Sequence, residues 1–231
     1  MAMIKEKLEF LRAAIAQICA RCGRNPDEII LVGVTKFADA DKIAEAVRCG
    51  LTDIGENKVQ VAQGKFPALG ELLPAVRKHM IGHLQTNKVK PVLELFDMIQ
   101  SVDSLRLAEE IDKQARKRGQ KADVLIQVDC AGEEQKFGVP AEEALDFMDQ
   151  AAGLEYVRVN GIMTIAPFVE DESVIRSCFS AARVIRDRAA KRFAGAPQVS
   201  MKYLSMGMTH DYAFAIQEGA NMLRVGTAIF G

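Results

Sequence analysis

The chain has 231 residues, enough to bury a sizeable core, and one domain is the default organisation for an α/β barrel of this length. Lys and Arg number 30 and Asp and Glu 31, so the formal net charge of −1 argues against nucleic acid or an anionic membrane as a partner. No apolar run is long enough to span a bilayer, and the N-terminus lacks the apolar segment of a signal peptide. The odd number of cysteines, 5, predicts reduced thiols in a cytoplasmic protein.

The first predicted element is an amphipathic helix. Its apolar side chains recur at three- and four-residue steps: Ile4, Leu8, Leu11, Ile15 and Ile18. Gly23 and Pro26 end this pattern, so we expect a helix within residues 1–24 that packs on the rest of the chain. Cys19 and Cys22 have the C-x-x-C spacing, but no second Cys or His pair follows at metal-binding spacing, and we predict no metal site.

Short apolar runs typical of strands then alternate with stretches typical of helices. We expect eight strands, over residues 29–35, 53–56, 79–83, 98–102, 124–129, 157–164, 202–206 and 222–226. The helices expected between them include residues 39–48, 104–118, 141–152 and 171–191. This alternation predicts an α/β protein, a single-domain (β/α)8 barrel spanning residues 1–231. A doubly wound sheet is the alternative, weakened because no G-x-G-x-x-G or P-loop sequence follows a strand.

A lysine, Lys36, stands at the end of the first strand-like run. The carboxyl ends of strands are where α/β folds assemble their ligand sites. We expect Lys36 to be partly buried, because desolvation favours the neutral amine that attacks a carbonyl carbon. The pattern suggests a lysine that forms a Schiff base. A solvated lysine in the loop before the next helix is the alternative.

Polar residues also follow other predicted strands. Asn57 follows the second strand, His83 ends the third, and Thr164 ends the sixth, next to Met163. Lys136 lies in the Gly-containing segment after the fifth strand. Each of these residues is a candidate for the site, although helix caps and polar loops explain many residues of this kind.

The last two strands end in sequences that predict an anion site. Ser205 and Gly207 close the seventh strand, and Gly226 and Thr227 close the eighth. Backbone N–H groups at glycine turns, a hydroxyl group and a helix N-terminus bind phosphate together, and barrels often place phosphate after strands seven and eight. Tight turns with helix caps are the alternative reading.

Arg224 lies in the apolar eighth strand, and its alternation with Met222 and Gly226 directs it to one face, which we expect to be the barrel interior. A buried guanidinium group needs an acceptor. An ion pair with Glu56 is one interpretation, and a ring nitrogen of a bound heterocycle is the other.

Six motifs, in order, carry a resemblance that runs from Ile29 to Gly231. They are Val-Thr-Lys at 34–36, Gly-Glu-Asn at 55–57, His-Met-Ile-Gly-His-Leu-Gln-Thr-Asn-Lys at 79–88, Gly-Ile-Met-Thr at 161–164, Leu-Ser-Met-Gly-Met at 204–208 and Arg-Val-Gly-Thr-Ala-Ile-Phe-Gly at 224–231. The chain resembles the pyridoxal phosphate homeostasis protein family, which is related to the N-terminal barrel domain of alanine racemase. Thr35 replaces the serine usual before the lysine, and Lys78-His79-Met80 replaces Trp-His-Phe.

The resemblance implies a cofactor, pyridoxal 5′-phosphate (PLP), attached to Lys36 as a Schiff base. It implies that Arg224 faces the pyridine nitrogen. The phosphate would be held by Ser205, Gly207, Gly226 and Thr227. Four further residues match positions around the cofactor, with less defined roles: Asn57, His83, Met163 and Met206.

The resemblance also implies a function, that of a monomeric carrier that buffers PLP, with apo-PLP enzymes as recipients and an indirect effect on amino-acid and keto-acid balance. We expect no catalytic residue, because an arginine at the ring nitrogen leaves the pyridine neutral and a weak electron sink. The rival is an amino-acid racemase with Tyr212, His83 or Lys136 as second base. Related racemases take that base from an extra β-domain, which we do not expect here. A more distant alternative is a Schiff-base aldolase that uses Lys36 as its nucleophile and no cofactor.

Overall fold

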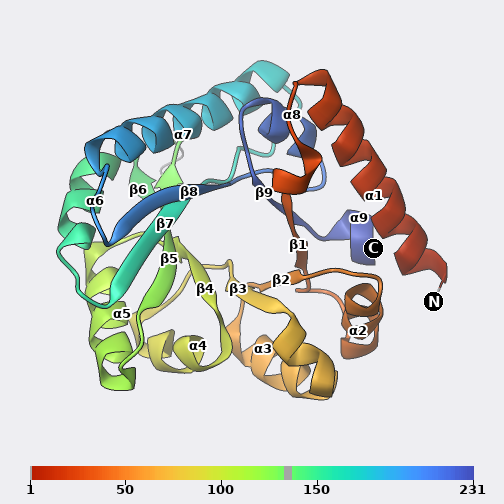
Figure 1. Ribbon diagram of the computed structural model, residues 1–231, viewed down its shortest axis with the longest axis horizontal. Helices are drawn as coiled ribbons and strands as arrows, with labels where there is room; N and C mark the ends of the chain where they lie inside the picture. The colour runs from red at the N-terminus through yellow and green to blue at the C-terminus, as the bar shows by residue number, and fades with distance from the viewer. Residues whose placement is uncertain (1, 133–136) are drawn as a thin grey trace.

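The strands of the computed structural model, which describes residues 2–132 and 137–231, form a closed parallel barrel (Figure 1). In chain order they are β1 (Ile30–Val34), β2 (Asp53–Glu56), β3 (Arg77–Met80), β4 (Met98–Val102), β5 (Ala122–Asp129), β7 (Val157–Met163), β8 (Val199–Ser205) and β9 (Met222–Val225). Neighbours in the chain are neighbours in the barrel, and β9 closes the ring on β1. Strand β6 (Val139–Pro140) pairs beside the end of β5. The predicted barrel is confirmed, and the doubly wound alternative is wrong.

Helices surround the barrel on the outside (Figure 1). They are α1 (Ala2–Arg21), α2 (Ala40–Arg48), α3 (Val59–Lys65), α4 (Val89–Leu95), α5 (Leu105–Arg118), α6 (Ala144–Ala152), α7 (Glu172–Arg192), α8 (Tyr212–Gln217) and α9 (Thr227–Phe230). Short 3₁₀ segments cover Pro26–Glu28, Phe66–Ala75 and Thr86–Lys88. None of the helices in the described part of the chain combines the length and apolar character needed to cross a membrane.

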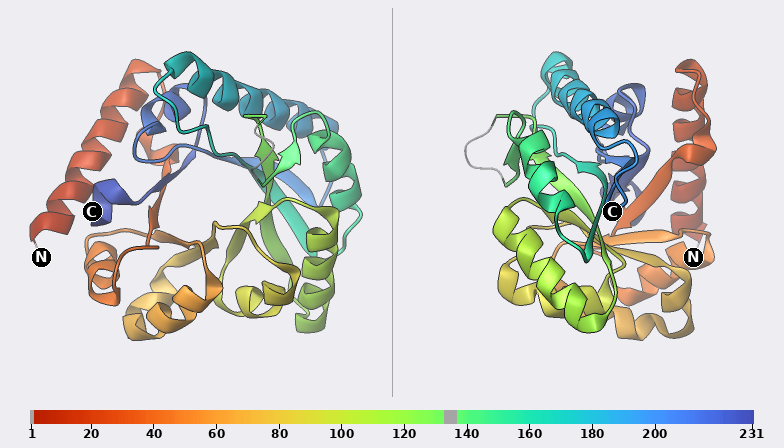
Figure 2. Two further views of the ribbon diagram at one scale, coloured as in Figure 1. Left: turned by 180° about the vertical axis from the view of Figure 1, so that it is seen from behind. Right: turned by 60° about the vertical axis from the view of Figure 1, so that its left-hand side comes forward.

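The N-terminal helix α1 packs on the outside of the barrel, as the sequence predicts. Its apolar stripe is buried, with Leu8 fully covered and Leu11 2% exposed. Helix α1 lies against α2, α8 and α9 (Figure 2). At its start, Lys7 donates a hydrogen bond to the carbonyl of Gly231. The two ends of the chain are therefore joined on one side of the barrel.

The core has two layers. Apolar side chains between strands and helices form the larger one, and a second cluster fills the barrel interior: Val32, Met98, Leu125, Met163, Tyr203 and Met222. The interior is a packed core and not a pore, as is usual for this fold. Arg224, Ser205, Gln100 and His79 are buried polar residues that share this interior.

Two strand boundaries differ by three residues from those that the sequence predicts, and the others agree within two residues. Strand β8 starts at Val199, three residues before the predicted start, and β3 ends at Met80, three residues before the predicted end. After β3 the backbone turns close to β2, because a Cβ atom at Gly82 would lie 2.3 Å from the carbonyl oxygen of Asn57. His83 therefore lies in the loop after the strand.

Candidate cofactor site

The residues predicted for the site follow strands that are neighbours in the barrel. Strand β1 lies between β2 and β9, with Val34 opposite Gly55 and Val32 opposite Arg224. Parallel strands end at one rim, so the loops after β1, β2 and β9 lie side by side there. Lys36, Asn57 and Gly226 are in these loops. The fold thus collects the predicted residues at the carboxyl ends of the strands.

Lys36 follows β1 in a tight turn, and its side chain is exposed. Its Nζ lies 5.0 Å from the centre of the ring of Phe37, which is itself 88% exposed. The expected partial burial of Lys36 is therefore wrong, because the lysine lies beyond the end of the strand. Its primary amine is open to a ligand at the mouth of the barrel.

A buried cluster fixes the backbone that carries this lysine. The hydroxyl of Thr35 donates to Glu56 Oε2 at 3.0 Å. Lys65 Nζ lies 3.1 Å from the same carboxylate oxygen and donates to the carbonyl of Thr35 at 2.8 Å. The side chain of Glu56 is fully buried, and that of Lys65 is 19% exposed. This cluster connects β1, β2 and α3 directly beneath Lys36, and sequence analysis missed Lys65.

We expect Glu56→Gln to lower the free energy of unfolding by about 3–5 kcal/mol, because it leaves the charge of Lys65 without its buried partner. Urea unfolding followed by circular dichroism measures this change. Glu9→Gln is the matched control, since the Lys5–Glu9 pair is exposed on α1 and its loss should change little. A Glu56→Gln protein as stable as the control variant would show that the cluster does not fix this backbone.

Arg224 points into the barrel and is 4% exposed. Its Nη1 donates to Ser205 Oγ at 2.7 Å and its Nη2 donates to the carbonyl of Thr164 at 2.8 Å. Burial lowers the pKa of Arg224 to about 10, against the opposing field of Asp211, so the guanidinium stays charged at neutral pH. The interior position predicted from the alternation is confirmed.

The ion pair with Glu56, one of the two interpretations of Arg224, is wrong. Glu56 instead pairs with Lys65. Within residues 2–132 and 137–231, no carboxylate forms an ion pair with Arg224, whose two hydrogen-bond partners are neutral oxygens. A buried cation of this kind retains the capacity to donate to a further acceptor, such as a ring nitrogen.

The side chain of Ser205 contacts Arg224, and its geometry differs from that expected of a phosphate ligand. Its hydroxyl accepts from Arg224 and donates to Gln100 Oε1 at 2.6 Å, and the residue is fully buried. Both contacts lie inside the barrel. The structure therefore favours a role for Ser205 beneath Arg224 over the predicted phosphate contact.

Two glycine turns flank the rim where the phosphate site is predicted. Gly207 has φ +95°, and a Cβ atom there would lie 2.6 Å from Ala215 Cβ, so only glycine fits. A Cβ atom at Gly226 would lie 3.3 Å from the carbonyl oxygen of Val34, two residues before Lys36. Thr227 is exposed at the first position of α9. The turn after β9 thus lies directly against the end of β1.

Asn57 and His83 line a cavity of about 360 Å³ between the loops after β2 and β3. His83 Nδ1 lies 2.9 Å from Asp103 Oδ2, and the ring of His83 stacks on that of Phe137 at 3.7 Å between centres. Sequence analysis missed Asp103 and Phe137, because nothing in the spacing links them to His83. Lys136 lies outside the described residues.

The two predicted methionines face different layers of the core. Met163 is buried inside the barrel, at the end of β7. Met206 follows Ser205, and its side chain is buried in the layer between strands and helices. The side chain of Met206 therefore does not face the site, which follows from the two-residue alternation of a strand.

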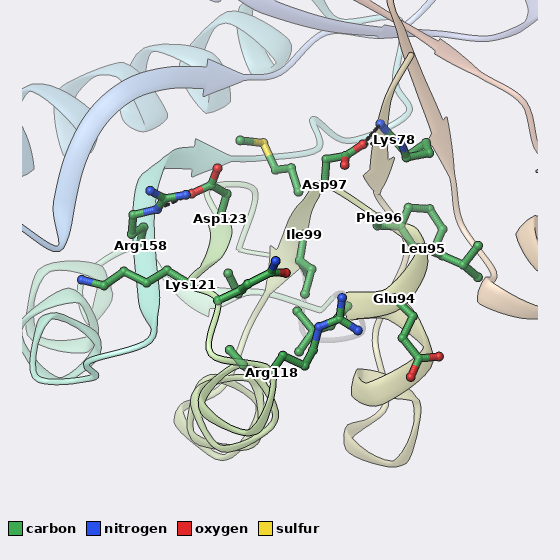
Figure 3. Close-up of a pocket in the computed structure, with 15 residues that line it drawn as sticks. Lys78, Glu94, Leu95, Phe96, Asp97, Ile99, Arg118, Lys121, Asp123 and Arg158 are labelled. Atoms are coloured by element: carbon green, nitrogen blue, oxygen red, sulfur yellow. Dashed lines mark hydrogen bonds and ion pairs between the residues drawn. The ribbon is translucent and has the colours of Figure 1, made fainter. Parts of the chain in front are cut away.

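Another cavity, of about 430 Å³, lies at the opposite ends of β3, β4 and β5 (Figure 3). Its wall carries two ion pairs, Lys78 with Asp97 at 2.8 Å and Arg158 with Asp123 at 2.7 Å. The amino-terminal end of a barrel serves stability, whereas chemistry lies at the carboxyl ends of the strands. No group of three metal-ligating side chains was found in the part of the chain that the structure describes.

The fold and this set of residues define a class of protein: a β/α barrel of the alanine racemase N-terminal type, with a lysine after the first strand and a buried arginine in the last. The family described as alanine racemase, N-terminal domain, matches residues 7–231. The pyridoxal phosphate homeostasis protein of Aquifex aeolicus is 39% identical over 226 residues, which are 98% of this chain and 96% of the relative. The pyridoxal phosphate homeostasis protein of Escherichia coli K12 is 37% identical over 99% of this chain and 96% of the relative. The chain belongs to the pyridoxal phosphate homeostasis protein family.

Solved structures agree with this assignment. PipY of Synechococcus elongatus, with PLP bound, has a TM-score of 0.85 at 35% identity. The match covers 99% of this chain and 100% of the PipY chain. The structure of an unknown protein from Bifidobacterium adolescentis has a TM-score of 0.94 at 36% identity, and the match covers 99% of this chain and 95% of that one. Alanine racemase of Clostridium difficile has a TM-score of 0.74 at 16% identity and shares the fold; this chain spans 56% of it.

Proposed function

We propose that the protein binds PLP covalently at Lys36 and acts as a carrier that buffers the cofactor. The observation that carries this proposal is the pairing of an exposed amine after β1 with a buried, charged Arg224 in β9, the strand beside it. Arg224 has two neutral partners and no paired carboxylate among the described residues, which suits an arginine that donates to a ring nitrogen. PipY, a relative at 35% identity, has been solved with PLP bound.

Each of the other groups has a role in this proposal. Backbone N–H groups of two turns hold the phosphate, because the glycines of these turns allow close approach: the turn at Gly226 and Thr227, and the turn at Gly207. Asn57 and His83 line the side of the site next to β3. When bound, PLP supplies an aldehyde for the lysine amine and a pyridine ring that acts as an electron sink.

Two observations support a carrier over a racemase. With a pKa of about 10, Arg224 is charged at neutral pH, so it donates to the ring nitrogen and leaves the pyridine a weak electron sink. Of the proposed second bases, Tyr212 packs against the outer core layer, and His83 is engaged with Asp103. Three further predictions from the sequence belong to this proposal: apo-PLP enzymes receive the cofactor, the protein is a monomer, and its location is cytoplasmic.

With saturating L-alanine, we expect the visible spectrum of the PLP-loaded protein to shift while racemisation and transamination stay undetectable. The expectation follows from the neutral pyridine and from the contacts that engage Tyr212 and His83. Chiral chromatography of the amino acid measures it. Sustained turnover at an ordinary enzymic rate, about 1 per second or faster, would favour the racemase instead. A purified protein without a visible band after addition of PLP would favour the aldolase.

A further inference from the structure

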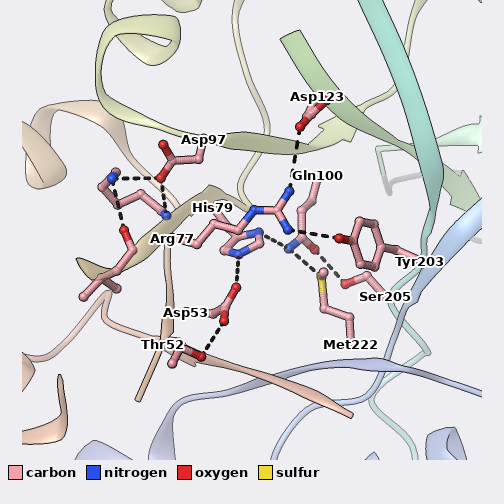
Figure 4. A network of polar contacts seen from close by, with 12 residues as sticks. Thr52, Asp53, Arg77, His79, Asp97, Gln100, Asp123, Tyr203, Ser205 and Met222 are labelled. Atoms are coloured by element: carbon pink, nitrogen blue, oxygen red, sulfur yellow. Dashed lines mark hydrogen bonds and ion pairs between the residues drawn. The ribbon is translucent and has the colours of Figure 1, made fainter. Parts of the chain in front are cut away.

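A line of polar side chains crosses the barrel interior beneath Arg224. The line begins at Ser205, which contacts Gln100. Gln100 Nε2 lies 3.0 Å from His79 Nδ1, and His79 Nε2 lies 2.9 Å from Asp53 Oδ1 (Figure 4). Ser205, Gln100 and His79 are fully buried, and Asp53 is 8% exposed. Counted from Arg224 to Asp53, this hydrogen-bonded chain takes one residue from each of five strands: β9, β8, β4, β3 and β2. It runs from the cofactor end of the barrel to the amino-terminal ends of the strands.

The direction of every hydrogen bond in this chain is fixed by its first member. A guanidinium group only donates, so Ser205 accepts from Arg224 and must give its single proton to Gln100 Oε1. The amide nitrogen of Gln100 then faces His79 Nδ1, which must accept. His79 is therefore neutral, with its proton on Nε2, and donates to the Asp53 carboxylate.

The surroundings of His79 support this protonation state. Burial lowers the pKa of His79, although the hydrogen bond with Asp53 opposes that shift. Arg77 disfavours a charge on His79, whereas Asp97 favours it. The second Asp53 oxygen accepts from Thr52 Oγ1 at 2.8 Å, and Gln100 Nε2 also lies 3.2 Å from Met222 Sδ. The hydrogen-bonded chain thus connects the buried cation of Arg224 to the carboxylate of Asp53, and every hydrogen bond in it donates in the same direction.

Such a chain is not needed to fill the barrel. Its neighbours in the interior are apolar. Replacing buried polar groups by apolar side chains of similar volume often costs no stability in proteins. A fully satisfied polar network does, however, hold its members in one geometry. The member that reaches the proposed cofactor position is Arg224.

We propose that Ser205, Gln100 and His79 are positioning residues that hold the Arg224 guanidinium in one orientation, with a free N–H directed at the ring nitrogen of PLP. This inference rests on the proposed function for the identity of the ring. Its consequence is that the ring nitrogen stays neutral over a wide pH range, because Arg224 cannot rotate away and admit a proton from water. Asp53 anchors the far end of the chain.

The protonation state of His79 tests the chain in the wild-type protein without any cofactor. The sequence has 3 histidines, and those other than His79 are exposed, so His83→Gln and His210→Gln variants assign the ring signals. Nitrogen–proton correlation spectra should show the His79 proton on Nε2 alone. A proton on Nδ1, in either the neutral or the charged ring, would overturn the proposed direction of the chain.

A second experiment measures the effect on the ring, using PLP labelled with ¹⁵N in the pyridine. The ring signal should be independent of pH in the wild type. In Ser205→Ala it should move with pH as the nitrogen takes up a proton, and Ser205→Thr should restore the wild-type behaviour. Ser101→Ala is the matched control, since this buried serine is also on the barrel but donates to the carbonyl of Gly82, outside the chain.

The outcomes separate this inference from the proposed function. If Arg224→Gln makes the ring signal dependent on pH but Ser205→Ala does not, Arg224 faces the ring and the positioning role is wrong. If Arg224→Gln has no effect on the ring signal, the placement of Arg224 in the proposed function is itself wrong. The His79 measurement stands in either case, because it needs neither PLP nor a core variant.

Discussion

Lys36→Ala should abolish the visible absorption of the PLP-loaded protein while leaving the fold intact. The reason is that Lys36 is exposed after β1 and contributes little packing, so its loss removes the amine and almost nothing else. Absorption spectra after incubation with PLP and gel filtration measure the first effect, and thermal unfolding measures the second. We expect a complete loss of the band and a Tm close to that of the wild type.

Lys58→Ala is the control for Lys36→Ala, because Lys58 is also an exposed lysine at the carboxyl-end rim, directly before α3. This variant should keep both the band and the stability of the wild type. A Lys36→Ala protein that stays yellow, with borohydride labelling at Lys58 or Lys136, would show that the attachment point has been assigned to the wrong residue.

Gly226→Leu should weaken PLP retention by at least tenfold, which corresponds to about 1.4 kcal/mol of binding free energy. A side chain there meets Val34, whose Cβ atom and carbonyl oxygen would both lie 3.3 Å from the new Cβ atom. The turn after β9 must then move away from β1, and with it the backbone N–H groups proposed to bind phosphate. Equilibrium dialysis against PLP measures the change in Kd.

Gly64→Leu in α3 is the matched control for this substitution, since a Cβ atom at Gly64 has no neighbour within 4 Å. It should bind PLP as the wild type does. If Gly226→Leu also binds PLP at full affinity, the phosphate site lies elsewhere on the rim.

The architecture was predictable because each strand carries its own signal. Apolar runs with β-branched residues identified the strands, and the alternation of strands with helices identified the barrel. The end of β3 was not predictable in this way. The segment after Met80 remains apolar, but Gly82 approaches the Asn57 backbone, and this contact between two loops leaves no pattern in either one.

The interior position of Arg224 was predictable from the alternation along one strand. Met222 and Arg224 do share the interior face, as their two-residue spacing indicates. The partners of Arg224 depend on the stagger between strands, which the sequence does not encode locally. Glu56 was therefore one of two partners considered for Arg224, whereas in the structure Glu56 pairs with Lys65 and Arg224 donates to Ser205.

The sequence left both a partly buried and a solvated Lys36 open, and the choice between them depends on where the strand ends. The apolar run predicted a strand through Thr35, but β1 ends at Val34, and Thr35 donates hydrogen bonds to Gly55 and Glu56 of β2. Turn geometry of this kind is decided by contacts with the neighbouring strand.

The most direct test of the account is the identity of the lysine that holds PLP. The purified protein, loaded with PLP, is reduced with borohydride, digested and mapped by mass spectrometry. The account predicts a single pyridoxyl label on Lys36. A label on another lysine, or no stable label on a protein that binds PLP, would contradict it.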